Sequence, residues 1–82
     1  MKKGNSIADA ILIDAQDTSS GITEEHKYLD QLCKKFNTGI EAIDQRIIIE
    51  NGRQYDVFNL TMDDGKKKIL YFDISSFFGK LI

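Results

Sequence analysis

The residues that could serve as a nucleophile and its base are one cysteine and one histidine, Cys33 and His26. A cysteine nucleophile needs its base within hydrogen-bond reach. On a single helix, the separation of these two residues along the axis is about 10 Å. Cys33 also falls within an apolar stripe, where cysteine usually acts as a small hydrophobic residue. We therefore predict no catalytic residues and expect that the protein is not an enzyme.

The sequence predicts neither a metal ion nor a bound cofactor. A zinc site needs several ligands at defined spacing, and His26 has only Glu25 and Asp30 near it. Asp63 and Asp64 precede a glycine, which indicates a turn, and they lack the alternating ligands and distal glutamate of a calcium loop. The closest glycines are 13 positions apart, so no glycine-rich phosphate loop occurs.

Composition and charge indicate one small soluble domain over residues 1–82, with a flexible tail over residues 1–5. The chain is 41% hydrophobic and 29% charged, with a formal net charge of −2. The basic run Lys66-Lys67-Lys68 directly follows two aspartates, so we expect no nucleic acid and no membrane as partner. Asp9 interrupts the amino-terminal apolar stretch, which excludes a secretory signal there. We expect a cytoplasmic protein.

The clearest predicted element is a helix that follows Thr23, which we expect to be its N-cap. An apolar stripe with helical period consists of Tyr28, Leu29, Leu32, Cys33 and Phe36. The polar face is expected to carry Glu24, Glu25, Lys27, Asp30, Gln31, Lys34 and Lys35. The glutamates and the last two lysines then lie in the first and last turns, where they suit the helix dipole. Asn37-Thr38-Gly39 is the predicted stop.

Three strands are predicted after the helix, over residues 46–50, 54–62 and 67–74. Asn51-Gly52 suits a type I′ turn between the first two. A two-residue loop at the second turn would place Asp56 opposite Asp73, and like charges opposite each other are unfavourable. A three-residue loop with Gly65 in the left-handed conformation pairs Asp56 with Phe72 instead. We therefore predict the three-residue loop.

This register makes both faces of the three-stranded meander partly apolar. One face carries Phe58, Leu60, Met62, Leu70 and Phe72. The other carries Tyr55, Val57, Ile69 and Tyr71. One helix covers one face of a small meander, so the second face needs another cover. We predict these four residues as a possible interface for a homodimer or for docking to a larger protein.

The amino-terminal segment, residues 7–15, fits either a strand or a helix. A strand would join the sheet ahead of the helix in a β-α-β-β-β order, and a helix would give an α-α-β-β-β order. We expect the strand, and hence an α+β fold with one amphipathic helix packed on a three-stranded antiparallel meander. The tail over residues 75–82 is expected to form a helical turn that packs Phe77 or Phe78 on the sheet.

A set of short segments resembles a group of small uncharacterised bacterial proteins. These segments are Gly21-Ile22 at the helix start, Tyr28-Leu29 within the helix, the Asn51-Gly52 turn, and the ending Tyr71-Phe72-Asp73-Ile74-Ser75-Ser76-Phe77-Phe78-Gly79-Lys80. The resemblance spans the chain from about Gly21 onward. It implies a bacterial source and an accessory role.

These observations favour a non-enzymatic interaction or accessory protein, which uses an apolar sheet face for dimerisation or docking. One alternative is a small-ligand carrier or minor enzyme with a pocket between helix and sheet. That pocket would need polar groups from Tyr28, Asn59 and Tyr71 to converge. Another alternative is an immunity or antitoxin protein that neutralises a toxin.

Overall fold

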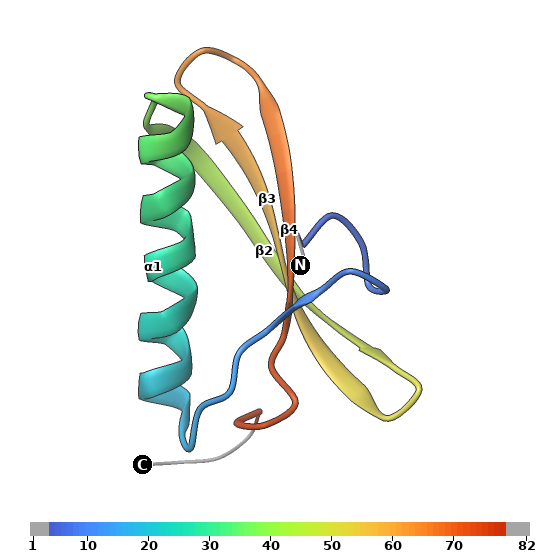
Figure 1. Ribbon diagram of the computed structural model, residues 1–82. Helices are drawn as coiled ribbons and strands as arrows, with labels where there is room; N and C mark the ends of the chain where they lie inside the picture. The colour runs from blue at the N-terminus through green and yellow to red at the C-terminus, as the bar shows by residue number, and fades with distance from the viewer. Residues whose placement is uncertain (1–3, 79–82) are drawn as a thin grey trace.

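Four strands and one helix make up the part of the chain that the structure, a computed structural model, describes, residues 4–78. Their order is β1 (Ile11–Leu12), α1 (Thr18–Phe36), β2 (Ile40–Glu50), β3 (Arg53–Met62) and β4 (Lys67–Asp73). The strands form one sheet in the order β1-β4-β3-β2, and α1 lies along one face of it (Figure 1). The predicted α+β fold and its β-α-β-β-β order are confirmed, and the order with two helices is wrong.

The first strand is much shorter than the segment predicted for it. Ile11 and Leu12 pair in parallel with Phe72 and Asp73 of β4. Ile11 is buried and Leu12 is 58% exposed, the alternation that a strand imposes. Upstream of this strand, Gly4 is buried and its carbonyl accepts a hydrogen bond of 2.8 Å from the amide of residue 71. The tail predicted over residues 1–5 thus meets β4 at Gly4, and residues 1–3 lie outside the described range.

The helix begins at Thr18, earlier than predicted, because Asp17 caps it. The Asp17 side chain accepts a hydrogen bond of 2.9 Å from the amide of Ser20. Thr23 lies inside the helix, where its hydroxyl donates to the carbonyl of Ser19. The prediction of Thr23 as N-cap is therefore wrong, and so is the placement of two glutamates in the first turn. The predicted stop is confirmed, since the left-handed C-cap is residue 37.

Gly21 lies within this helix, although a glycine there costs about 1 kcal/mol relative to alanine. A Cβ atom at Gly21 would lie only 2.3 Å from the nearest ring atom of Phe77. Glycine therefore lets that ring pack directly on the helix backbone. This tertiary contact overrides the local preference that had suggested a helix start after Gly21.

Both predicted turns are confirmed. Asn51 and Gly52 have φ values of 52° and 75°, as a type I′ turn requires. At the second turn Gly65 has a φ of 85° and Asp56 pairs with Phe72, so the loop has three residues. The strand before the first turn begins at residue 40 rather than 46, because its pairing with β3 continues along the whole length of β3.

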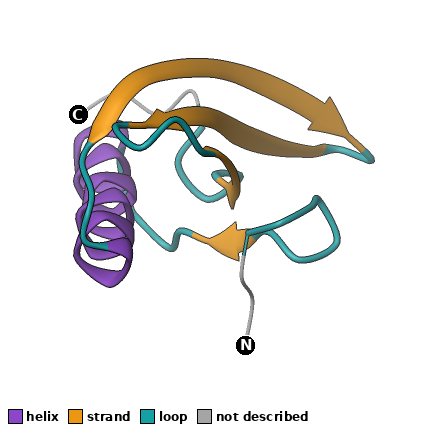
Figure 2. Ribbon diagram, turned by 90° about the horizontal axis from the view of Figure 1, so that it is seen from above, coloured by secondary structure: helices purple, strands orange, loops and turns teal. Residues whose placement is uncertain are grey.

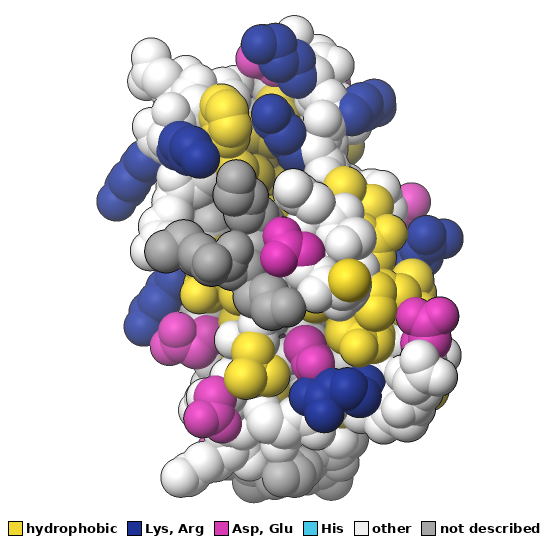
Figure 3. Space-filling view, turned by 45° about the vertical axis from the view of Figure 1, so that its right-hand side comes forward, with side chains coloured by type: hydrophobic (Ala, Val, Ile, Leu, Met, Phe, Trp, Pro, Cys, Tyr) yellow, Lys and Arg dark blue, Asp and Glu magenta, His cyan; other side chains and the backbone are white. Residues whose placement is uncertain are grey.

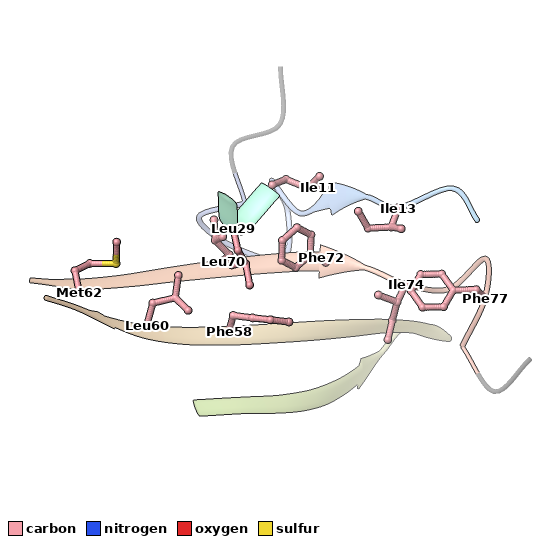
Figure 4. Packing of buried hydrophobic residues seen from close by; sticks show 10 residues of the cluster. All are labelled: Ile11, Ile13, Leu29, Phe58, Leu60, Met62, Leu70, Phe72, Ile74 and Phe77. Atoms are coloured by element: carbon pink, nitrogen blue, oxygen red, sulfur yellow. The ribbon is translucent and has the colours of Figure 1, made fainter. Parts of the chain in front are cut away.

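The hydrophobic core lies between α1, β1 and the face of β3 and β4 that bears Phe58, Leu60 and Phe72. Figure 4 shows side chains rising from β3 and β4 toward Leu29 of α1 and toward Ile11 and Ile13. In the view from above, the long strands arch over the helix and β1, which lie on the same side of the sheet (Figure 2). None of the ten residues labelled in Figure 4 comes from β2. The helix therefore packs on β3 and β4.

Two serines after β4 fasten the sheet to the amino-terminal half of the chain. The hydroxyl of Ser75 accepts a hydrogen bond of 2.9 Å from the amide of Gln54 and donates one of 2.7 Å to Asp73. The hydroxyl of Ser76 donates a hydrogen bond of 2.7 Å to the carbonyl of Ile13. Residues 75 and 76 thus tie β3, β4 and the connection between β1 and α1 together.

The turn that follows these serines packs one phenylalanine and exposes the other. The amides of Phe77 and Phe78 both donate to the carbonyl of Ile74, which makes the predicted helical turn. Phe77 is 4% exposed and Phe78 is 42% exposed. The tail after residue 78 lies outside the described range. Phe77, packed on the helix, is therefore the residue that holds this segment in place.

Asp73 accepts hydrogen bonds from Arg53 at 2.7 Å and from the hydroxyl and amide of Ser75 at 2.7 and 3.0 Å. Burial opposes its ionisation, but these bonds outweigh burial and hold the pKa of Asp73 below its usual value of 3.8. A lowered pKa stabilises the folded state above the usual pKa, and this contribution is lost as the pH falls through the folded-state pKa.

We expect Asp73→Asn to lower the free energy of unfolding by about 1–2 kcal/mol at pH 7, because charged hydrogen bonds are lost. The difference from the wild type should shrink in acid, where the wild-type carboxyl is itself protonated. Urea unfolding at several pH values measures both effects. Asp30→Asn, at an exposed position on α1, is the control, and an equal loss in both variants would contradict the prediction.

Candidate functional site

The most exposed element of the sheet is β2, an outer strand of 11 residues. Within residues 4–78, only β3 pairs with it. Its side chains of Ile43, Ile47 and Ile49 are 51%, 46% and 65% exposed. An apolar edge strand with unpaired N–H and C=O groups is a template for pairing with another chain. This open edge is the candidate functional site.

The exposure of β2 follows from the size of the single helix. An α-helix is about 10 Å wide, whereas neighbouring strands lie about 4.8 Å apart, so one helix covers about two strands. Here those two strands are β3 and β4. Ile43 pairs with Leu60, whose side chain belongs to the core, so Ile43 points to the helix side of the sheet. It nevertheless stays exposed because α1 does not reach that far.

Two rows of side chains leave β2 on opposite faces. The odd row, on the helix side, consists of Ile43, Gln45, Ile47 and Ile49. The even row, on the other face, consists of Ala42, Asp44, Arg46, Ile48 and Glu50. The odd row is mainly apolar, and the even row carries charges of both signs. A partner strand would meet both rows at once.

A buried carboxyl on α1 lies against the neighbouring strand, β3. We predicted Glu25 on the polar face of the helix, and the structure shows that this is wrong, since Glu25 is 2% exposed. Glu25 precedes Leu29 by four residues, so the two side chains share one face. Its carboxyl makes a side-chain hydrogen bond with Asp56, which is 4% exposed. The spacing of four residues between Glu25 and Leu29 was the signal in the sequence from which the burial of Glu25 could have been predicted.

The environment of Glu25 keeps its carboxyl protonated at neutral pH. Burial first, and then the hydrogen bond and the charge of Asp56, raise the pKa of Glu25 from 4.5 to about 9. The protonated carboxyl can donate its proton to Asp56. Its atom Oε2 is buried and accepts no hydrogen bond from the described part of the chain, which fits an oxygen that itself carries the proton.

Gln45 connects the carboxyl pair to the open edge. Its Nε2 atom donates to both carboxylate oxygens of Asp56, each at 2.9 Å. Polar contacts therefore run from Glu25 on α1 through Asp56 on β3 to Gln45 on β2. A network of this kind favours one arrangement of the packed elements over others. Here it holds the side chain at the centre of β2.

Paired carboxyls also occur in hydrolases, where one acts as an acid and the other as a base or nucleophile. Such chemistry requires that substrate reach both groups. Glu25 and Asp56 are buried, and they face the inside of the helix–sheet contact. We therefore assign them to the packing of the sheet.

The four residues predicted as a possible interface share one face, away from α1. Val57 pairs with Tyr71, and Asn59 pairs with Ile69. Val57 is fully buried and Tyr55 is 7% exposed, whereas Ile69 and Tyr71 are half-buried. Figure 3, in which the right-hand side of Figure 1 comes forward, shows hydrophobic side chains at the surface among acidic and basic ones. The isoleucines of the odd row of β2 are more exposed than these four residues. The predicted strand over residues 46–50 contained only part of that row.

The polar groups required for a helix–sheet ligand pocket do not converge. The Tyr28 ring lies 5.8 Å from that of Phe72, on the helix side. Asn59 and Tyr71 lie on the opposite face, because they alternate with core residues of β3 and β4. A surface hollow of about 410 Å³ between α1 and β4 is lined mainly by apolar side chains, and Lys68 lies across it, over the ring of Phe36.

His26 and Cys33, the residues considered as base and nucleophile, differ in their surroundings. His26 is exposed on α1, and Cys33 packs against the core. The described residues contain no group of three or more potential metal ligands. The helix of this range does not combine the length and apolarity that a membrane span requires.

Comparison of the chain with models of protein families, with curated proteins and with solved structures finds no match. The resemblance to small bacterial proteins therefore stays a prediction. The structure does assign a role to four residues of the ending that carries it, since Asp73, Ser75, Ser76 and Phe77 make contacts that hold the fold together.

Proposed function

We propose that this chain is a non-enzymatic interaction protein that binds another protein through the open edge of β2. The observation that carries the proposal is an outer strand of 11 residues with three isoleucines about half exposed or more. When a strand adds to a sheet edge, main-chain hydrogen bonds contribute affinity and alternate side chains contribute specificity. Both contributions are available along β2.

β2 carries only some of the features with which proteins usually protect such an edge. Proline, inward lysines, bulges and short length prevent unwanted pairing. The chain contains no proline, and β2 contains no lysine. Its bulge lies at its first residues, between Ile40 and Ala42, which leaves the remainder regular. An edge that is long, regular after its first residues and mainly apolar on one face is suited to a partner.

The proposed contact differs from the face predicted from the sequence. Tyr55 and Val57 are already covered, so they offer little surface to a partner. Burial of exposed Ile43, Ile47 and Ile49 would be favourable by about 25 cal/mol for each Å² of apolar surface removed from water. The edge of β2 therefore supports association better than the face does.

We expect Ile47→Lys to weaken association through this edge at least ~10-fold, because it removes apolar contact and places a charge within the edge. Light scattering over a range of concentrations measures self-association, and retention of the purified chain on immobilised candidate proteins measures other binding. Ile22→Lys is the matched control, since Ile22 on α1 is 45% exposed and Ile47 is 46% exposed. If Ile47→Lys behaves as the wild type in both measurements, the proposal is wrong.

A further inference from the structure

We infer that the strand that pairs with β2 is β2 of a second copy, in an antiparallel dimer. Its twofold axis passes between the two copies of Gln45, and this position is called the axis at Gln45 below. This inference rests on the proposed function and specifies its partner. It follows from the sequence of the edge strand and from the faces to which its side chains point. Twofold symmetry then determines which residues would oppose each other.

Gln45 is the middle residue of Ile40–Glu50. In a twofold antiparallel pair, residues on the same face oppose each other. The axis therefore passes between the two copies of one residue, which oppose each other directly. The bulge between Ile40 and Ala42 limits a regular ladder to residues 42–50. Within this range an axis at Asp44 pairs residues 42–46, an axis at Gln45 pairs residues 42–48, and an axis at Arg46 pairs residues 42–50. Ladder length alone does not select the register, and the side chains decide it.

The charges of the even row favour the register with the axis at Gln45. With the axis at Gln45, Asp44 opposes Arg46 of the second copy, and symmetry makes this contact twice. With the axis moved by one residue, either Asp44 or Arg46 would oppose its own copy. With the axis at Ile47, Asp44 would oppose Glu50. Opposite charges across a ladder are favourable and like charges are unfavourable, so the centred register is selected over its neighbours.

The side chains of the odd row also favour the register with the axis at Gln45. With the axis at Gln45, Ile43 opposes Ile47 of the second copy, again twice. These side chains are 51% and 46% exposed in the single chain, and pairing would bury them against each other. Gln45 lies at the axis with its amide held by Asp56, so it presents a fixed side chain to its own copy. The two four-stranded sheets would form one continuous sheet with both helices on the same face.

Charge reversal tests the register without touching the core. In the Asp44→Arg dimer, two arginines face each other across the ladder, and in the Arg46→Asp dimer, two aspartates do. Because like charges repel, we expect each substitution to weaken the dimer at least ~10-fold. The double reversal restores the opposite charges and should bring the dissociation constant back to within about threefold of the wild type. Sedimentation equilibrium of the full chain measures these values, with Asp30→Arg on the exposed face of α1 as control.

Disulfide trapping tests the same register by geometry. In a Cys33→Ala background, chains with Ile43→Cys are mixed with chains with Ile47→Cys under mild oxidation. Opposed residues have Cα atoms about 4.5–5.5 Å apart, within disulfide range. Each position lies four residues from its own copy along the ladder, about 13 Å, which is out of range. We expect disulfide-linked dimers in the mixture and not in either chain alone.

The outcomes separate this inference from the proposed function. Restoration by the double reversal, together with trapping only in the mixture, supports the dimer centred on Gln45. If Ile47→Lys abolishes association but the double reversal does not restore it, the register is wrong and the edge remains the binding site. If the wild-type chain is a monomer at every concentration, the second copy is not the partner. The proposed function then stands only if Ile47→Lys abolishes binding to a different protein.

Discussion

At pH 8, Glu25→Gln is expected to unfold at a higher temperature than the wild-type protein. The variant keeps the size of the side chain and an amide that can donate to Asp56, but it has no proton to lose. The wild-type carboxyl is buried beside Asp56, and its pKa is raised to about 9 by burial and by that neighbour. We expect a gain of about 2 kcal/mol or more, which corresponds to ~8–16 °C for a domain of this size.

The pH dependence of this effect follows from proton binding. The pKa of Glu25 is 4.5 in the unfolded chain and about 9 in the folded one, so between these values the folded state holds a proton that the unfolded state has released. Stability from this group is complete below pH 4.5 and is lost progressively as the pH rises toward 9, by at most ~1.4 kcal/mol per pH unit. The advantage of Glu25→Gln should therefore be small near pH 4.5 and grow steadily up to pH 9.

Thermal unfolding followed by circular dichroism from pH 4.5 to pH 9 measures this dependence. Glu24→Gln is the matched control, because Glu24 precedes Glu25 on the same helix turn and pairs with Lys27 at the surface. Surface pairs of this kind contribute about 0–1 kcal/mol, so this variant should follow the wild-type curve. If Glu25→Gln is less stable than the wild type at pH 8, the assignment of a buried, protonated Glu25 is wrong.

Phe77→Ala is expected to be the most destabilising single change in the carboxyl-terminal segment. The Phe77 ring is 4% exposed and lies against the helix backbone at Gly21. Removal of a buried phenylalanine ring costs about 3–5 kcal/mol, a large part of the stability of so small a domain. Urea unfolding measures the loss. Phe78→Ala, at an exposed neighbour, should change stability by no more than ~0.5 kcal/mol.

Gly21→Ala provides a sharper test of the same contact, because its effect should change sign. In the wild-type chain the new methyl group would overlap the Phe77 ring, and such overpacking costs about 1–3 kcal/mol. In the Phe77→Ala chain the ring is gone, and alanine should stabilise the helix by about 1 kcal/mol relative to glycine. If Gly21→Ala stabilises both chains equally, the ring does not pack on the helix as described.

Local signals in the sequence determined the turns and the order of the strands. Asn51-Gly52 and Asp63-Asp64-Gly65 predicted both hairpins, including the pairing of Asp56 with Phe72, because turn conformation and like-charge repulsion act between residues close in the chain. The stop of the helix at Asn37 was predicted for the same reason.

Long-range contacts decided the features that local signals missed. Gly21 belongs to the helix because Phe77, far along the chain, packs on it. Glu25 is inside because it meets Asp56 of β3, whose carboxylate in turn accepts from Gln45 of β2.

The exposure of β2, and with it the candidate site, was also decided only by tertiary structure. The isoleucines Ile47, Ile48 and Ile49 predicted a strand, and a run of this kind suits a buried strand as well as an exposed one. Which of the two occurs depends on the strand order and on how far one helix extends across the sheet. The sequence by itself thus determined that a strand forms here, and the packing of α1 on β3 and β4 left that strand open to a partner.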